Sequence, residues 1–302
     1  AFRKAAGESW SLEDLQLSVT DTDRPGVKQM VSSRVFFDAA IVDALGEVAK
    51  TESPVLTYLA TDIKKGDKLT PYSMVTGVGP NLNQIVGKEI SDTDIILSDW
   101  LAEDLEAAQG DEITLVYNVV GQGRALVEQS KTFTVAKVVP IGESGWNAKW
   151  TPDFPGIFDV EDLDEWEPGI PIDRDKIRDK DDEFWDEYRA TPKAFVNLAA
   201  AREMWSNRFG NATSVRFELE DAQTLLVDQL RVHLKLEQLG MAFRDLPAEA
   251  KAAVSNSFDF GSLFASMSFF LIVAALVLAS LVFIFGIEQR SSQIGLLMAM
   301  GF

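Results

Sequence analysis

The pattern of apolar and polar residues changes abruptly close to the end of the chain. Between Asp259 and Glu288 the sequence has no charged residue, whereas the part before it alternates short apolar runs with polar ones. About 20 apolar residues are enough to cross the hydrocarbon core of a bilayer. Because backbone polar groups must be hydrogen-bonded inside lipid, such a run must be a helix. The sequence therefore predicts a transmembrane helix over 258–287, with 1–257 and 288–302 on opposite sides of the membrane.

The alternative for this run is a buried helix of a large soluble protein. Helices of soluble proteins generally keep one polar face, and this run has none. A secretory signal peptide lies at an N-terminus, whereas this run lies near the C-terminus. We therefore favour a membrane span, and we expect the chain to be part of a longer membrane protein.

Before the span, the apolar pattern indicates both strands and helices. Strands are predicted at 55–59, 72–78, 94–97, 113–120, 131–139, 192–198 and 213–220. Helices are predicted at 36–45 with an interruption at Gly46, from Trp100 to Gly110 with Ser98 or Asp99 as cap, up to Trp205, and over 221–240. This mixture predicts an α+β extracytoplasmic domain of two subdomains, followed by a single long transmembrane α-helix.

Glycine and proline mark the predicted breaks between these elements. Ser53-Pro54 is expected to interrupt the chain before the strand 55–59, and Lys65-Gly66-Asp67 is expected to form a turn. Gly121-Gln122-Gly123 could suggest a phosphate-binding loop, but no helix start with a third glycine follows it. We expect it to be the turn of a hairpin that joins 113–120 to 131–139.

Residues 141–190 differ in character, because they are rich in Asp, Glu, Pro, Gly and Trp. We interpret them as a solvated acidic insertion with aromatic anchors. The pairs Asp173/Asp175 and Asp179/Asp181 suggest a calcium site as the alternative, although neither follows the EF-hand pattern. After the last predicted strand, apolar residues at helical spacing predict a helical stalk over about 221–254 that leads into the membrane.

Charge and composition narrow the class of protein. The 302-residue chain has a net charge of −19, which argues against nucleic acid and against an anionic membrane surface as partners. It has no cysteine, so a disulfide framework, a thiolate nucleophile and a zinc–thiolate site are excluded. Its one histidine, His233, falls in a helical apolar pattern that indicates a packing or surface role.

Catalytic and nucleotide-binding motifs are missing from the sequence. Gly87-Lys88 is followed by Glu89 and lacks the upstream glycine of a phosphate loop. Gly142-Glu143-Ser144-Gly145 is not a nucleophile elbow. We therefore predict a protein that is not an enzyme and that has no cofactor; if it uses ATP, another chain must hydrolyse it.

The sequence around the span carries a resemblance to a known family. Asp259-Phe260-Gly261 precedes the apolar run, and Arg290 followed by Ile294-Gly295-Leu296-Leu297 and Gly301 comes after it. These residues resemble the second transmembrane helix and the following cytoplasmic segment of FtsX-like permeases, the membrane subunits of the MacB and lipoprotein-export type of ABC transporter. Family members usually have Glu where this chain has Gln293.

A second part of the resemblance lies upstream. The runs 94–98, 110–115 and 131–139 are similar to the periplasmic core domain of that family, and 55–60 and 190–196 look like a subgroup with an enlarged ectodomain. The family implies four transmembrane helices, with the large domain between the first and the second. It also implies a bacterial inner membrane location with 1–257 in the periplasm.

The resemblance implies that the segment 288–302 rests on an ABC ATPase subunit. The residues expected at this contact are Arg290, Ile294, Gly295, Leu297, Met298 and Gly301. Helical spacing places the larger apolar residues and Gly301 on one face, and Arg290 could meet an acidic partner. The expected role is to couple ATP hydrolysis to movement of the periplasmic domain for the export of a lipoprotein, lipid or other substrate.

Further partners follow from the same resemblance: the lipid bilayer, a second permease in a homo- or heterodimer, and a possible periplasmic protein. Three alternatives stay open. The chain could be a non-transporting regulator of cell-wall hydrolases, a membrane-tethered binding module, or a tethered enzyme that uses the acidic insertion. The segment after the span could also be a loose juxtamembrane helix.

Overall fold

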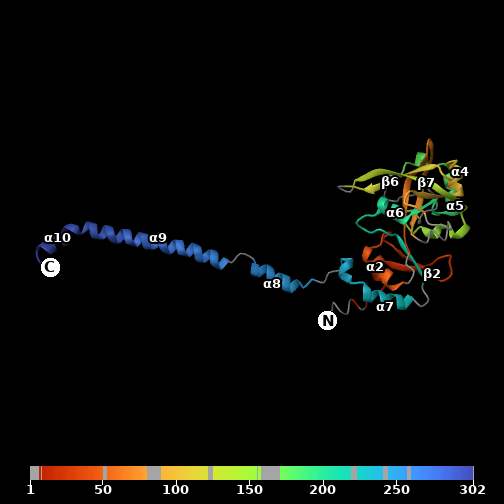
Figure 1. Ribbon diagram of the computed structural model, residues 1–302. Helices are drawn as coiled ribbons and strands as arrows, with labels where there is room; N and C mark the ends of the chain where they lie inside the picture. Colours follow the sequence, from red (N-terminus) through yellow and green to blue (C-terminus); the bar gives the residue numbers. More distant parts are fainter. Residues whose placement is uncertain are drawn as a thin grey trace. The chain divides into compact units, whose positions relative to one another are not determined.

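The computed structural model describes residues 7, 9–49, 53–79, 90–121, 125–154, 156–157, 171–218, 223–240, 244–256 and 260–301. The chain divides into two compact units, Ala1–Ala242 and Phe243–Phe302, and each is described by itself (Figure 1). The first unit combines strands and helices, and the second is helical. The α+β class and the long C-terminal helix predicted from the sequence are confirmed.

The described strands of the first unit form one mixed sheet in the order β1-β2-β9-β3-β4-β8-β5-β7-β6. Their bounds are β1 Leu17–Asp21, β2 Val27–Ser32, β3 Ser53–Lys65, β4 Lys68–Val78, β5 Asp94–Ser98, β6 Glu112–Val120, β7 Leu126–Val139, β8 Ala194–Asn197 and β9 Ser214–Glu218.

Helices lie before, between and after these strands. In the first unit they are η1 Glu13–Leu15, α2 Ala39–Val48, α4 Asp99–Asp104, η3 Glu143–Gly145, η4 Ala148–Trp150, η6 Arg174–Lys176, α5 Asp179–Tyr188, α6 Leu198–Trp205, α7 Gln223–His233 and η7 Leu236–Leu239. In the second unit they are α8 Leu246–Asn256, α9 Phe260–Gln289 and α10 Ser291–Ala299.

Six strands of the sheet close into a ring. Neighbouring strands pair in the order β3-β4-β8-β5-β7-β6, and Asp62–Lys64 of β3 then pairs with Thr114–Val116 of β6. The pairs β4–β8 and β5–β7 are parallel, and the other pairs of the ring are antiparallel. Closure leaves the ring without an open edge along these paired segments, and a barrel of this kind encloses a packed core.

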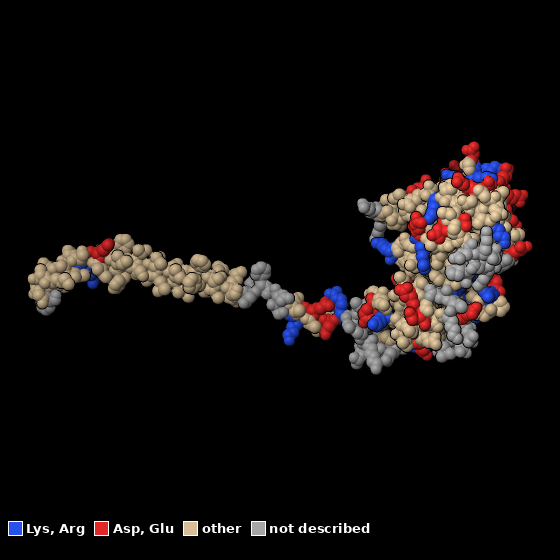
Figure 2. All heavy atoms as spheres, viewed as in Figure 1, with Lys and Arg blue, Asp and Glu red and all other residues tan. Residues whose placement is uncertain are grey.

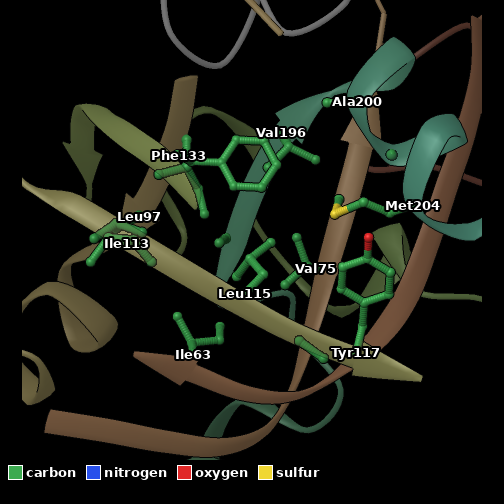
Figure 3. Close-up of a cluster of buried hydrophobic side chains, with 14 of the residues drawn as sticks. Ile63, Val75, Leu97, Ile113, Leu115, Tyr117, Phe133, Val196, Ala200 and Met204 are labelled. Carbon is green, nitrogen blue, oxygen red and sulfur yellow. The ribbon is translucent and has the colours of Figure 1, made fainter. Parts of the chain in front are cut away.

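The largest core cluster is built from the ring strands together with α4 and α6 (Figure 3). Apolar side chains from every ring strand enter this cluster, because alternate residues of a strand point to the same side. It includes Leu56, Ile63, Val75, Ile95, Leu97, Leu101, Ile113, Leu115, Phe133, Val196 and Met204, which are all buried.

The remaining strands extend the sheet beyond the ring. β9 pairs with Ser53–Val55 at the start of β3, β2 pairs with β9, and β1 pairs with β2, all antiparallel. Helices α2 and α7 contact each other, and Figure 1 shows them beside β2. The Arg231 guanidinium donates a hydrogen bond through Nε to the Trp10 carbonyl at 3.1 Å. This bond joins α7 to the N-terminal segment within the same unit.

The described part of the acidic insertion is partly buried. Trp146 and Trp150 each meet the Phe195 ring of β8 edge-on, with centroids 4.4 and 5.3 Å apart. The Arg216 guanidinium of β9 lies over the Trp150 ring at 3.3 Å from its centroid. The segment therefore joins the ring to the strands beyond it. The acidic run 159–166 lies outside the described residues.

Several predicted boundaries are wrong. The helix predicted from Trp100 to Gly110 ends at Asp104, because Glu106 adopts a left-handed φ of 48°. Helix α2 continues through Gly46 to Val48, since its buried face outweighs the low helix propensity of glycine. Pro54 lies inside β3, where a residue without an N–H is tolerated near the start of a strand.

The segment 221–254, predicted as a helical stalk, contains the separate helices α7 and α8. Helix α7 ends at His233 and buries Leu226 and Leu230 in the first unit, whereas α8 belongs to the second unit. Gly240, with a left-handed φ of 77°, follows η7 and interrupts helical geometry between them. Pro247 stands at an early position of α8, where its missing N–H has no intrahelical partner to lose.

Gly77 of β4 lies close against α6. A Cβ placed there would overlap the Cβ of Ala201 in α6, whereas a Cβ at Gly79 would lie 3.8 Å from the nearest atom of Leu198. We expect Gly77→Ala to lower the free energy of unfolding by about 1–3 kcal/mol through overpacking.

Urea unfolding of the full chain in detergent, followed by tryptophan fluorescence, measures this loss. Gly79→Ala is the matched control, and equal losses in the two variants would contradict the prediction.

Candidate functional site

The second unit contains the predicted membrane span. The stretch Gly261–Gln289 of α9 is long and apolar enough to cross a membrane by length and composition, with a mean hydropathy of 3.0. Figure 2 shows this helix almost without charged groups along its length. Of the predicted motif before the span, Asp259 lies outside the described residues, Phe260 begins α9, and Gly261 lies in the first turn.

The predicted ATPase-contact segment forms a separate helix directly after α9. Arg290 joins the two, with φ −97° and ψ 2°, and its carbonyl accepts a hydrogen bond from the Ile294 N–H at 2.9 Å. Ile294, Leu297 and Met298 of α10 are exposed in this chain and share one face by helical spacing. Gly295 lies within the helix and adds no side chain to it. The structure therefore presents the predicted apolar residues on one short helix.

Gly301 does not belong to that helical face. Helix α10 ends at Ala299, with Met300 as its C-terminal cap, and Gly301 follows with a left-handed φ of 90°. A glycine in this conformation is a common way for a helix to end, because it lacks the Cβ that would be strained there. The sequence-based placement of Gly301 on the helix face is therefore wrong, and its position is that of a helix terminator.

In the first unit, the outer part of the hairpin formed by β6 and β7 pairs with no other strand among the described residues. β6 and β7 pair from Glu112/Thr134 to Val120/Leu126, so the expected hairpin is confirmed, although residues 122–124 of its turn lie outside the described residues. Strand β3 pairs with β6 only at 114–116, and β5 pairs with β7 only from Thr134 onward. The outer part of the hairpin therefore extends beyond the ring, as Figure 1 shows.

The tip of this hairpin is apolar on both faces. Val120 and Leu126 are cross-strand partners with 62% and 39% of their surfaces exposed. Val127, which is 44% exposed, pairs with Val119 on the opposite face. Exposed apolar clusters of this kind commonly mark contact surfaces. We call these four residues the hairpin tip.

A buried ion-pair network fastens α5 to the ring. The Arg178 guanidinium, at the start of α5, donates to Asp181 at 2.7 and 2.8 Å and to Asp104 of α4 at 2.8 Å. It also donates to the Leu69 carbonyl of β4 at 2.9 Å. Both carboxylates are almost fully buried. Burial alone would raise the pKa of Asp104, but bonds from Lys180, Thr70 and Arg178 outweigh it, so this pKa lies below its ordinary value.

Lys193 is a buried cation beside this network. Its Nζ lies 3.5 Å from Asp181 and sits over the rings of Trp100 and Phe184, at 4.2 and 4.5 Å from their centroids. Only 4% of the residue is exposed. Burial lowers the pKa of its amine to about 8, and the opposing charge of Asp181 limits this shift.

The described residues that could bind a metal ion do not gather at one place. Among them, no group of three His, Asp or Glu side chains is placed to hold a metal ion. Two of the carboxylates considered for calcium are engaged by the protein, since Asp173 accepts from the Asp175 N–H and Asp181 accepts from Arg178. His233 is exposed at the end of α7. Gly87 and Lys88 lie outside the described residues.

Sequence reasoning missed both the ion-pair network and the apolar hairpin tip. Asp181, in the first turn of α5, accepts a hydrogen bond from the Arg178 N–H at 3.1 Å, which is the part of a capping box that an acidic residue supplies at this position. The partnership with Asp104 joins segments far apart in the chain, and no local pattern indicates it. Residues 119–120 lie at the end of a predicted strand, and 126–127 lie in the loop predicted after it. Their exposure depends on where β3 and β5 stop pairing, which no local pattern indicates.

Comparison with known proteins finds similarity only among solved structures. No protein family matches the sequence, and no curated protein matches it. The periplasmic region of MacB from Actinobacillus actinomycetemcomitans aligns with 10% identity and a TM-score of 0.34, over 72% of this chain and 83% of that one. The extracellular domain of the noncanonic ABC-type transporter YknZ from Gram-positive bacteria aligns with 11% identity and a TM-score of 0.36, over 75% and 94%.

A third similar structure is a domain of a protein described as a permease from Porphyromonas gingivalis, with 9% identity, a TM-score of 0.36, and coverage of 74% and 86%. At these identities and TM-scores the similarity concerns the fold alone.

Proposed function

We propose that this chain is part of a permease subunit of an ABC transporter, with 1–257 outside the cytoplasm and 288–302 against an ATPase subunit. One observation carries this proposal: the Arg290–Gly301 segment, with its family-like residues, forms a short apolar helix directly after a charge-free span. Ile294, Leu297 and Met298 are exposed there, and apolar side chains in water favour burial against a partner.

In this proposal, ATP binding and hydrolysis in the partner move α10, and α9 transmits the movement across the bilayer. Helix α9 has 30 residues, and its backbone hydrogen bonds make it a rigid element. We place the transmitting element in α9 and α10. The substrate class is an exported lipoprotein, lipid or other molecule, and the chain itself performs no chemistry.

A charge on the apolar face of α10 tests this proposal. Leu297→Asp should weaken binding of the ATPase subunit by about 2 kcal/mol, roughly thirtyfold, because a carboxylate would be buried at the contact. The measurement is co-purification of a Walker-motif ATPase with the full-length protein from native membranes, together with its ATP hydrolysis rate. Ser292→Asp, which adds the same charge away from that face, is the matched control. Equal recovery of the ATPase with both variants would contradict the proposal.

The hairpin tip is the proposed contact for a protein partner outside the membrane. Its apolar side chains lie on both faces and at unpaired strand edges, which suits insertion into a concave apolar surface or strand addition. The chain has no cysteine, so a single cysteine can carry a photo-crosslinker. Val127→Cys should crosslink to an extracytoplasmic protein in cells, whereas Glu112→Cys at the base of the hairpin should not.

The identity of the crosslinked protein separates the two main functions. A lipoprotein or another export component supports transport. A cell-wall hydrolase or its adaptor supports the regulator alternative. Equal crosslinking from both cysteine positions would show that the hairpin tip is not the contact surface.

A further inference from the structure

Helix α10 is apolar on the side away from the proposed ATPase contact as well. Leu296 and Met300 follow Ile294 and Met298 by two positions, and residues two apart lie about 200° apart around a helix. Leu296 and Met300 are 63% and 61% exposed in this chain. A contact with the ATPase centred on Ile294 and Met298 would therefore leave a second apolar ridge uncovered, and Leu297 lies between the two sides.

Helix α10 has no charged side chain that would favour exposure of this second ridge to water. From Ser291 to Gly301 the sequence has no ionisable residue, and its polar side chains are Ser291, Ser292 and Gln293, all in the first turn. An ordinary surface helix has a charged face opposite its apolar one. Helices with little charge and apolar residues around the later turns are stable when both sides are covered.

The position of α10 in the chain indicates what covers the second ridge. Helix α9 has 30 residues and so extends about 45 Å, whereas the hydrocarbon core is about 30 Å thick. A centred α9 therefore ends in the headgroup layer, and α10 begins two residues later, at Ser291. Arg290 interrupts the helix, and Figure 1 shows the chain bending at this point. The first turn of α10 thus starts at the depth of the lipid headgroups.

We propose that Leu296 and Met300 face lipid at the boundary between headgroups and acyl chains, so that α10 lies between the bilayer and the ATPase. This inference rests on the proposed function for the opposite face, but its lipid contact needs no ATPase. Helices of this type bury their apolar side about 5–10 Å into the interface. The adjacent charges, Glu288 and Arg290, are of opposite sign, so zwitterionic lipid is sufficient for the contact.

Site-directed spin labelling tests the two faces separately, because the chain contains no native cysteine. The variants are Leu296→Cys and Met300→Cys on the proposed lipid side, and Ile294→Cys and Met298→Cys on the other side. Each full-length, nitroxide-labelled protein is reconstituted into phosphatidylcholine vesicles without an ATPase. Electron paramagnetic resonance then compares collisions with oxygen, which concentrates in lipid, and with a water-soluble nickel complex.

The expected result is a ratio of oxygen to nickel collisions several-fold higher at 296 and 300 than at 294 and 298. Phe270→Cys in the middle of α9 serves as the lipid reference, and Val232→Cys on α7 serves as the water reference. Equal ratios at all four positions of α10, or a higher ratio at 294 and 298, would overturn the inference. Such a result would not contradict the proposed ATPase contact, since that contact is measured separately with Leu297→Asp.

Discussion

Replacing Arg178 by methionine is expected to lower the free energy of unfolding of the first unit by about 3–5 kcal/mol. The substitution keeps much of the volume but removes every guanidinium bond to Asp104 and Asp181. Two almost fully buried carboxylates would then lose their bidentate partner. Lys180 and Thr70 still reach Asp104, and Lys193 still lies near Asp181. A buried carboxylate that loses a bidentate guanidinium nevertheless loses more than an exposed ion pair does, which is typically worth under about 1 kcal/mol.

Urea unfolding of the full chain in detergent measures this effect. All seven tryptophans lie before residue 242, so their fluorescence reports on the first unit alone. Arg174→Met is the matched control, because Arg174 is exposed in the same segment. If the two variants lost similar stability, the network would not be what fastens α5 to the ring. Arg178→Lys should fall between them, because it keeps the charge and loses the paired geometry.

Replacing Lys193 by methionine is expected to stabilise the first unit and to change how its stability depends on pH. Burial lowers the pKa of Lys193 from 10.5 to about 8 in the folded chain, so the unfolded chain binds more protons above pH 8. Stability of the unsubstituted chain should therefore rise with pH, by about 2 kcal/mol between pH 7 and pH 9.5. Methionine removes the titrating amine and keeps contact with Trp100 and Phe184, so this rise should disappear.

The stabilisation should be greatest at pH 7, where the unsubstituted lysine is charged and buried. Asp181 keeps its two bonds from Arg178, so the substitution leaves that carboxylate paired. The measurement is urea unfolding at several pH values from 7 to 9.5. Burial raises the pKa of Tyr58, whose titration affects stability only at higher pH. A variant that keeps the full rise with pH would show that Lys193 is not its source.

Local patterns indicated the strands and one helix start well. Ser98 caps α4 as expected, with its Oγ accepting from the Leu101 N–H at 3.1 Å. The strand 94–97 and the turn at 65–67 also lie where the sequence places them, because capping oxygens and turn glycines act over a few residues. The lengths of β3 and β7 were underestimated, since their ends are set by neighbouring strands.

Long-range features could not be predicted in this way. Closure of the ring depends on Asp62–Lys64 meeting Thr114–Val116, and no local signal reports a pairing between segments so far apart. The burial of Lys193 depends on α5 covering it, which the strand-like pattern around it does not reveal. The role of Gly301 as a helix terminator could be predicted from the sequence, because glycine just after a helix commonly takes a left-handed conformation.

The closed ring also sets an order of folding. Strand β8 lies between β4 and β5 and pairs with both, but it follows them only after the whole acidic insertion. Until Ala194–Asn197 has been synthesised, β4 and β5 each present an open edge, and open edges are where chains associate wrongly. Pairing between distant segments is slow, so ring closure is a late step of folding. A chain that stops before β8 is therefore expected to aggregate, whereas one that extends past Asn197 can close its barrel.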